Sequence, residues 1–454
     1  MKRVIITGVG AVSPLGNSFA ASWEAAKKGV SGIAPVTRFD ASGIKWKVAG
    51  ELKGFDASRY LSQKEISHLD PFVLYAVAAS IMAVEDAGLI EESNEQRATS
   101  RATSREQGAE ERIHPSQCYG EWKSGRAEVK GCRTSELPDF LTSRLASGGI
   151  IIGSSRGGIT TIENGLNRSS RSNRSRPSPY FMPSTSIGMA ASYVAQKLGI
   201  KGYSLGISNA CASGANAIGE GYRLIKSGYA GPVLAGGAEA PICRLCIEGY
   251  GVSGALSKIN DSSASRPFDR ARDGFVLAEG ACVLVLEDYE TALKRGAQIY
   301  GEIIGYGNTT DAYHLTRPNP EGEARAISMA IEQPGIDIKD IDYISAHGTS
   351  TPLGDKAETE AIKLAFGKRA YEIPVSSVKS MSGHMLSASG AFEAAITLMS
   401  MKEGIITPAI NLKEKDTECN LNYVTEIKKA GIKTAVSNSF GFGGVNAVLV
   451  FRRI

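Results

Sequence analysis

Histidine and cysteine are scarce in this chain, which has five histidines and seven cysteines in 454 residues. The cysteines are odd in number and irregularly spaced, which argues against a disulfide framework and predicts reduced thiols, as found in the cytoplasm. Cys243 and Cys246 form a Cys-x-x-Cys pair, but no second pair completes a zinc site. We therefore expect no metal, and we expect the few histidines to be informative.

Long apolar runs, an excess of one charge and a dinucleotide fingerprint are also missing. No apolar run approaches the ~20 residues of a membrane-spanning helix, and the N-terminal residues lack the apolar segment of a secretory signal. The net charge of +4 gives no sign of a nucleic-acid partner. The Gly pairs do not make a G-x-G-x-x-G motif. These absences predict a cytoplasmic globular protein, with neither membrane nor nucleic acid among its partners.

Glycine is abundant, with 51 residues, and apolar, β-rich runs recur along the chain. Such runs without strict alternation predict strands that are buried on both faces. Helical patterns lie between several of them, as at 71–88 and 359–367, and this alternation predicts an α/β architecture. The expected strands lie at 4–10, 150–155, 204–210, 233–239, 281–288, 299–307, 341–348, 375–379 and 446–451.

Two segments resemble each other and indicate an internal duplication. In each, a strand-like run leads through a reactive-looking residue to a helical pattern, first at Cys211 and then near His384. We therefore predict an N-terminal half over 1–254 and a C-terminal half over 255–454. A polar insertion at about 92–147 carries a tandem repeat of RATS and lacks apolar periodicity, so it is predicted to be a poorly ordered surface segment.

The stretch SNACASGANAIG, residues 208–219, contains the first candidate nucleophile. Cys211 lies where an apolar run gives way to a helical pattern, and the dipole and free N–H groups of a helix N-terminus lower the pKa of a thiol. Small residues follow it and leave space for a substrate. The alternative is an inert buried cysteine, which this motif alone leaves open.

Two further loops supply candidate acid–base groups. In AHGTSTPLGD (346–355), His347 ends a strand-like run and can donate a hydrogen bond to a substrate oxygen. In VSSVKSMSGHMLSASGAFE (375–393), Lys379 and His384 share a Ser- and Gly-rich loop, and Glu393 on the following helix is a possible partner for Lys379. The alternatives are a structural histidine and a solvated lysine.

The stretch NSFGFGGVN (438–446) is the fourth candidate, because the N–H groups of a Gly-rich turn can face an oxyanion. Phe440 and Phe442 are expected to form an apolar wall beside it. Taken alone, the stretch is better explained as a plain Gly-rich hairpin.

Together these motifs resemble the β-ketoacyl-acyl-carrier-protein synthases of the thiolase superfamily, and most of all the KAS II-like condensing enzymes of fatty-acid synthesis. The resemblance covers nearly the whole chain outside 92–147. It implies a duplicated five-layer αβαβα fold, a homodimer, and an acyl carrier protein as partner, with no cofactor. It rests on VIITGVGAVSPLG, NACASGANAIG, AGGAEA, SRPFDRARDGFVLAEGA, AHGTSTPLGDKAE, VSSVKSMSGHMLSASGA and NSFGFGGVNAVLVF.

The resemblance also implies a role for each candidate. Cys211 would carry the acyl group, a malonyl carrier would lose CO2, and the chain would grow by two carbons; the N–H groups of Cys211 and Phe442 would hold the oxyanion. The catalytic set it implies is Cys211, His347, His384 and Lys379, with Glu393 as the acidic neighbour of the lysine. The substrate-binding set is Thr349 and Thr351 on the pantetheine arm, with Phe440 and Phe442 beside the acyl chain.

Some positions depart from the family pattern. Arg156 stands where relatives usually have a small or apolar residue, and Ser186 where they often have a bulky apolar one, so the preferred acyl chain is not predicted. The segment 64–72 keeps Lys64 alone of the bases expected to dock the carrier. The stretch 167–179, with four arginines, is expected to be a solvated loop, or else a contact for an anionic partner such as the carrier.

Other members of the superfamily fit less well. A degradative thiolase needs a second cysteine in the C-terminal Gly-rich loop, and SFGFGGVN has none. A KAS III-type enzyme has asparagine at the position of His384, and a chain-length factor lacks the nucleophile. A type II polyketide or polyene ketosynthase shares every catalytic residue and stays open, as does a non-enzymatic scaffold.

Overall fold

The computed structural model describes residues 1–89, 143–171 and 177–454. Most of the predicted insertion therefore lies outside the described residues. Its last residues differ from the expectation, because Ser143–Ala146 form a short helix, α5, whose Leu145 is fully buried in the core. The polar stretch at 167–179 is also not simply a loop, since helix α6 runs from Ile159 to Arg171.

Eleven strands form one hydrogen-bonded sheet in the order β12-β10-β9-β14-β15-β8-β1-β7-β6-β4-β5. Strands β4, β5 and β6 run parallel, as do β9, β10, β12 and β14, whereas β1, β7, β8 and β15 pair antiparallel with their neighbours. The strands of this sheet are β1 (Val4–Val12), β4 (Gly149–Gly153), β5 (Ser204–Ile207), β6 (Val233–Glu239), β7 (Gly280–Asp288), β8 (Gly301–Thr310), β9 (Tyr343–Ser345), β10 (Pro374–Ser376), β12 (Asn422–Tyr423), β14 (Thr434–Gly441) and β15 (Val445–Arg452).

Helices cover and divide this sheet. Two short ribbons, β2 (Ala34–Pro35) with β3 (Val48–Ala49) and β11 (Ile405–Ile406) with β13 (Lys428–Lys429), lie outside it. The other helices are α1 (Phe19–Lys27), α2 (Gln63–His68), α3 (Pro71–Asp86), α7 (Phe181–Thr185), α8 (Met189–Lys197), α9 (Ser213–Lys226), α10 (Arg244–Val252), α11 (Tyr289–Lys294), α12 (Pro320–Glu332), α13 (Pro352–Phe366), α14 (Lys379–Ser382), α15 (Ser387–Glu403), and the short η1 (Ala57–Arg59), η3 (Ile338–Asp340) and η4 (Gly367–Tyr371).

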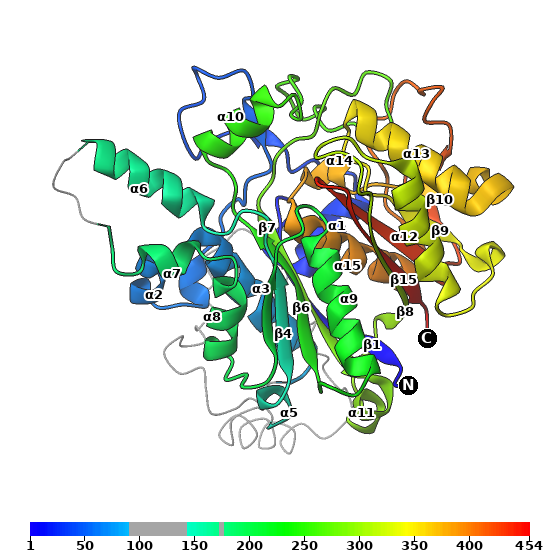
Figure 1. Ribbon diagram of the computed structural model, residues 1–454, viewed down its shortest axis with the longest axis horizontal. Helices are drawn as coiled ribbons and strands as arrows, with labels where there is room; N and C mark the ends of the chain where they lie inside the picture. The colour runs from blue at the N-terminus through cyan, green and yellow to red at the C-terminus, as the bar shows by residue number, and fades with distance from the viewer. Residues whose placement is uncertain (90–142, 172–176) are drawn as a thin grey trace, which may run out of the picture.

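The elements stack in five layers (Figure 1). Helices α9 and α15 pack on each other in the middle: α9 contacts β4 and β6 on one side and β15 on the other, and α15 contacts β6, β7 and β14. Helices α3 and α8 cover the outer face of the β5-β4-β6-β7-β1 wing, and α12 and α13 cover the other wing. The close packing of α9 on α15 depends on Gly214, because a Cβ there would lie 2.2 Å from the carbonyl oxygen of Ser387.

Most predicted strands occur close to their predicted positions. The strands that the sequence did not predict are β2, β3, β11, β12, β13 and β14. The stretch NSFGFGGVN (438–446) is the hairpin that joins β14 to β15, which confirms its interpretation as a plain Gly-rich hairpin. The boundary between the two halves at residue 255 stays a prediction. Among the described residues, no helix combines the length and the apolar composition that crossing a bilayer requires.

Candidate active site

Cys211 lies directly before Ala212, the N-cap of α9, where the chain leaves β5. The turn is fixed by Ser213, whose Oγ donates to the carbonyl oxygen of Ala210 (2.6 Å) and accepts from the N–H of Asn209 (2.8 Å). Ala210 itself has a left-handed φ of 48°, which is strained for a residue with a Cβ. The nucleophile candidate therefore lies on a tight turn that several hydrogen bonds fix, and its side chain is directed toward His384.

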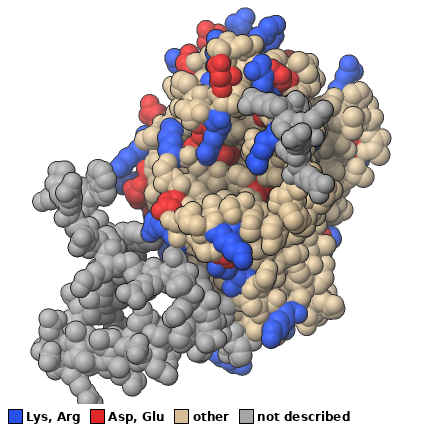
Figure 2. Space-filling view, turned by 90° about the vertical axis from the view of Figure 1, so that its left-hand side faces the viewer, with Lys and Arg blue, Asp and Glu red and all other residues tan. Residues whose placement is uncertain are grey.

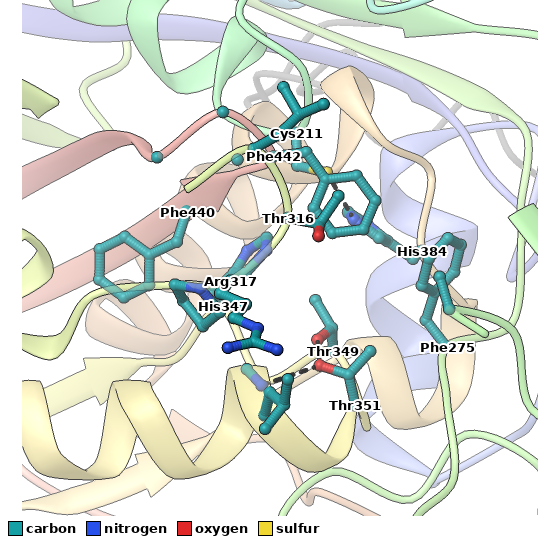
Figure 3. A pocket seen from close by; sticks show the side chains of 18 of the residues that line it. Cys211, Phe275, Thr316, Arg317, His347, Thr349, Thr351, His384, Phe440 and Phe442 are labelled. Atoms are coloured by element: carbon teal, nitrogen blue, oxygen red, sulfur yellow. Dashed lines mark hydrogen bonds between the residues drawn. The ribbon is translucent and has the colours of Figure 1, made fainter. Parts of the chain in front are cut away.

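The Cys211 thiol meets His384, which lies just before α15. The Sγ atom lies 3.0 Å from Nε2 of His384, as the dashed line in Figure 3 shows. Burial raises the pKa of the Cys211 thiol to about 11, although Lys379 and the N–H of Phe442 act in the opposite direction. The prediction that the helix N-terminus gives a low thiol pKa is therefore wrong for the resting site, because desolvation outweighs it.

His384 is held so that either ring nitrogen can carry the proton. Its Nδ1 lies 3.1 Å from Oγ of Ser389, and this hydroxyl also accepts from the N–H of Met385 (2.9 Å). A hydroxyl both donates and accepts, so it suits both tautomers of the imidazole. Burial and then Lys379 lower the pKa of His384 well below its ordinary value, which keeps the ring neutral.

His347 follows β9 and is oriented by Lys379. The Lys379 ammonium donates to the carbonyl oxygen of His347 (2.6 Å) and pairs with the carboxylate of Glu393, and its Nζ lies 3.3 Å from Nδ1 of His347. An ammonium has donors only, so Nδ1 accepts and the proton of the neutral ring is on Nε2. Burial, Lys379 and His384 lower the pKa of His347 well below its ordinary value. His347 is therefore a neutral hydrogen-bond donor.

The ion pair behind His347 is deeply buried. Lys379 and Glu393 are each 1% exposed, so the solvated lysine of the alternative interpretation is excluded. Burial raises the pKa of Glu393 to about 7 even though Lys379 lowers it. The three N–H groups of Lys379 have three acceptors, which satisfies the ammonium completely.

The C-terminal Gly-rich strand closes the site over Cys211. Gly441, the last residue of β14, approaches the nucleophile so closely that a Cβ would lie 2.9 Å from the carbonyl oxygen of Asn209 and 3.3 Å from the Cys211 nitrogen. The next N–H, that of Phe442, is directed at Cys211. The Phe442 ring is 38% exposed and lines the pocket, whereas Phe440 is buried with its ring centroid 5.9 Å from that of His347.

A cavity of about 400 Å³ connects these groups to the surface. Figure 3 shows Cys211 and Phe442 at the top, His384 on the right, His347 and Phe440 to the left, and Thr349 and Thr351 at the bottom. Arg317, which is exposed, also lines the cavity. The two threonine hydroxyls lie 3.0 Å apart, and Thr351 Oγ1 also caps α13 through the N–H of Gly354. Every predicted site residue thus lines this cavity except Lys379 and Glu393, which stand behind its histidine wall.

Two buried carboxylates of this region were not singled out from the sequence. Glu358 accepts the N–H groups of His347 (2.8 Å) and Gly348 (2.7 Å), which holds the histidine loop. Glu239, at the end of β6, accepts from Ser154 and from the N–H groups of Ser155 and Arg156. The signal was their place inside the motifs AHGTSTPLGDKAE and AGGAEA, where Glu239 ends β6 and Glu358 lies on the buried face of α13, because a charged residue in an apolar setting needs a partner.

The same donor set could in principle hold a metal ion. The Sγ of Cys211 and one nitrogen each of His347 and His384 lie within 4.8 Å of one another. The charged ammonium of Lys379, 3.3 Å from the other nitrogen of His347, opposes a second cation there. The arrangement suits a nucleophile with two hydrogen-bonding imidazoles better than a metal centre.

Comparison with known proteins agrees with this geometry. The model of the β-ketoacyl synthase N-terminal domain matches residues 1–147 and 136–292, and that of the C-terminal domain matches 300–413. The chain is 41% identical over 457 residues to a 3-oxoacyl-[acyl-carrier-protein] synthase 2 of Synechocystis, covering 100% of this chain and 98% of that one.

Solved structures show the same fold. The ishigamide ketosynthase/chain length factor superposes with a TM-score of 0.83 at 31% identity, covering 100% of this chain and 99% of that chain. A type II polyketide ketosynthase in complex with its acyl-carrier protein superposes with a TM-score of 0.80 at 30% identity, with 100% of both chains covered. With its thiolase-like α/β fold, this chain belongs to the β-ketoacyl synthase family.

Proposed function

We propose that this chain condenses an acyl group held on Cys211 with a malonyl group, releasing CO2 and lengthening the acyl chain by two carbons. The observation that carries the proposal is the 3.0 Å contact between Cys211 Sγ and His384 Nε2, with His347 as a second imidazole donor in the same pocket. This arrangement combines one nucleophile with two neutral hydrogen-bond donors, which acyl transfer and decarboxylation both require.

The first step is transfer of the acyl group to the enzyme. His384 Nε2 takes the thiol proton as Cys211 Sγ attacks the thioester carbonyl of the donor. The N–H groups of Phe442 and Cys211 stabilise the oxyanion. The donor C–S bond breaks, and the departing thiolate takes the proton from His384, which leaves acyl-Cys211 and a free carrier thiol.

The second step generates the carbon nucleophile. Before the malonyl carrier reacts, the neutral His384 ring changes from the Nδ1–H tautomer to the Nε2–H tautomer, in which its Nδ1 accepts from Ser389 Oγ. His347 Nε2–H and His384 Nε2–H then donate to the thioester oxygen of the malonyl carrier. The bond to the carboxylate breaks, CO2 leaves, and its electron pair forms an enolate that the two donors stabilise. The enolate carbon attacks acyl-Cys211, the C–S bond breaks, and the cysteine thiolate takes a proton. Neutral imidazoles suit this step, because they donate without placing a cation in an apolar pocket.

We infer that the donor and the malonyl group arrive on an acyl carrier protein, whose pantetheine arm passes Thr349 and Thr351. The support is the pocket mouth lined by these residues and by exposed Arg317, and the solved relative that binds its carrier. On the face in Figure 2, Lys and Arg side chains are scattered among Asp and Glu side chains and form no single basic patch. We place the carrier surface around the residues that line the outer part of the pocket, Thr349, Thr351 and Arg317.

We also infer a cytoplasmic homodimer. All five described cysteines carry free thiols, as expected in a reducing compartment. Strand β5 is the edge of the large sheet and is only partly buried, so its unpaired backbone groups offer a pairing surface to a second copy. Light scattering of the purified chain should give twice the monomer mass of 48.0 kDa, and a monomer at micromolar concentration would contradict the homodimer.

The proposed reaction is tested by replacing Cys211 with Ala. Wild-type protein incubated with acyl- and malonyl-carrier should gain the acyl mass on Cys211 and release labelled CO2. The variant should gain no acyl mass, whereas Cys419→Ala, a change of a buried thiol outside the pocket, should behave as wild type. Absence of both adduct and CO2 release in wild type would overturn the proposed function and favour the scaffold.

A further inference from the structure

Arg156, one of the departures from the family pattern, is held beside the nucleophile by its own loop. The loop at 154–158 follows β4, and the fully buried carboxylate of Glu239 fixes it by accepting from Ser154 Oγ (2.9 Å) and the N–H groups of Ser155 (2.8 Å) and Arg156 (2.9 Å). Ser155 Oγ in turn donates to the carbonyl oxygen of Ala210 (3.0 Å), the residue before Cys211. The backbone of Arg156 is therefore tied both to the sheet and to the turn that presents the nucleophile.

The side chain of Arg156 is oriented by Tyr250 on α10. Its Nε donates to the Tyr250 hydroxyl (2.7 Å), and its Cζ lies 5.0 Å from the centre of the tyrosine ring. Tyr250 lines the cavity together with Cys211, and its ring meets Phe275 at 5.5 Å, which meets His384 at 5.2 Å. The rings of His384, Phe275 and Tyr250 therefore form a row that ends at the Arg156 guanidinium.

The terminal nitrogens of Arg156 are available to a ligand. Within the part of the chain that the structure describes, the guanidinium contacts the hydroxyl and the ring of Tyr250 and makes no other hydrogen bond or ion pair, and Arg156 is exposed. A guanidinium offers five N–H donors in a planar fork and prefers oxygen acceptors in the same plane. The two terminal nitrogens, which carry four of the five N–H donors, therefore have no hydrogen-bond acceptor among the described residues.

We propose that Arg156 and Tyr250 form a subsite that selects acyl chains carrying an oxygen acceptor, a carbonyl or a carboxylate, a few carbons from the thioester. An acyl chain on Cys211 that extends along the Tyr250 ring reaches the guanidinium, which binds such an oxygen. An unmodified alkyl chain desolvates the same cation without giving it an acceptor, which is unfavourable. The inference rests on the proposed function, since it concerns the chain that Cys211 accepts.

The subsite also distinguishes two pathways that share every catalytic residue. Fatty-acid elongation presents saturated chains, whereas polyketide elongation presents chains with carbonyl groups along their length. A cation held next to Tyr250, which lines the cavity, favours the second kind. Ser186, which is small and polar where a bulky apolar residue was expected, lies in the segment that packs on the same loop, because a Cβ at Gly157 would lie 2.7 Å from the carbonyl oxygen of neighbouring Thr185.

The test is a competition between matched thioesters. Full-length protein is treated with pantetheine thioesters in pairs of equal length, valeryl with levulinoyl and hexanoyl with adipoyl, and acylation of Cys211 is followed by intact mass. Wild type should favour the oxygenated member of at least one pair by about ten- to hundred-fold, the range expected for a charge-assisted hydrogen bond. The levulinoyl pair tests a ketone oxygen and the adipoyl pair tests a carboxylate oxygen, so the two pairs show which kind of acceptor Arg156 binds.

Three variants complete the experiment. Arg156→Leu should lose this preference while reacting with hexanoyl at least as fast as wild type, which also shows that it is folded. Tyr250→Phe keeps the ring but releases the guanidinium, and it should weaken the preference several-fold. Arg244→Leu is the control: it removes an arginine of α10 that pairs with Glu248, and it should keep the wild-type preference.

The outcomes distinguish a failure of the Arg156 subsite from a failure of the proposed function. If wild type shows no preference for an oxygenated chain, or if Arg156→Leu and Tyr250→Phe both keep the wild-type preference, the subsite is refuted and the proposed function stands. If Cys211 of wild type takes no acyl group from any donor, the proposed function itself fails, and the subsite with it.

Discussion

Replacing Lys379 with Met should separate the two chemical steps. The change removes the donor to Nδ1 of His347, so the proton of that ring is no longer held on Nε2, where the enolate oxygen needs it. Loss of one such preorganised donor typically costs about 100- to 1000-fold in rate. We expect CO2 release from a malonyl carrier to fall by that factor, because the imidazole can then present its bare nitrogen to the substrate.

Acylation of Cys211 should respond differently to the same change. Lys379 acts on the thiol only through its charge, by opposing the effect of burial on the Cys211 pKa. Its removal raises that pKa further, so acylation should slow near neutral pH and recover as the pH rises. Decarboxylation should show no such recovery. If the rates of acylation and of CO2 release fall by the same factor at every pH, Lys379 does not set the tautomer of His347.

Stability has to be controlled in this experiment, because Glu393 is left as a buried carboxylate without its partner. Removing one member of a buried ion pair costs about 3–5 kcal/mol. The deficit should grow as the pH rises, since the folded protein, with a Glu393 pKa of about 7 even in the presence of Lys379, binds that proton more tightly than the unfolded chain does. The double variant Lys379→Met with Glu393→Gln should regain most of the stability by thermal unfolding, yet stay slow in CO2 release.

Further predictions concern the nucleophile and the strand above it. Alkylation of Cys211 by iodoacetamide should accelerate with pH toward the thiol pKa of about 11, and a plateau below about pH 8 would contradict a neutral resting thiol. CO2 release by wild type should stay nearly constant from about pH 8 to pH 6, because the low pKa values of His347 and His384 keep both rings neutral there. Gly441→Ala should leave thermal unfolding within a few degrees of wild type but slow acylation at least tenfold, measured by intact mass, because the new Cβ meets Asn209 and moves the Phe442 N–H away from Cys211.

The parts of the fold that follow from local pattern were predictable. The run VLAGGAE is strand β6 at the predicted residues, and the helical pattern after Cys211 is α9, because burial on both faces and helical periodicity are written directly into the sequence. Strand β14 was not predictable in the same way, since its polar residues Ser437, Asn438 and Ser439 are buried against the partner strands and side chains of the fold. The sequence shows those residues as turn formers, and only tertiary pairing makes them a strand.

The site was predictable in its members but not in its electrostatics. The sequence motifs indicate Cys211, His347 and His384, yet the helix-dipole argument applied to Cys211 alone gives the wrong direction for its pKa. That pKa depends on how completely the thiol is desolvated, and the residues that bury it come from other elements of the fold, such as Trp46, Phe275 and Leu386. Burial is a property of the folded protein that no local motif carries.

Neutrality of the resting site is what lets one pocket perform both reactions. A permanent Cys211 thiolate paired with a charged imidazole would serve the first step. A cationic His384 would then hold the malonyl carboxylate by its charge and disfavour the departure of that group as neutral CO2. Burial instead keeps the thiol and both imidazoles neutral. The positive charge lies outside the pocket, on Lys379, which contacts His347 and forms an ion pair with Glu393. Charge then develops only in the transition states, where the Phe442 N–H and the two histidines already point toward it. The depth of burial that makes Cys211 a poor thiolate at rest is therefore the same feature that makes His347 and His384 effective donors to the enolate.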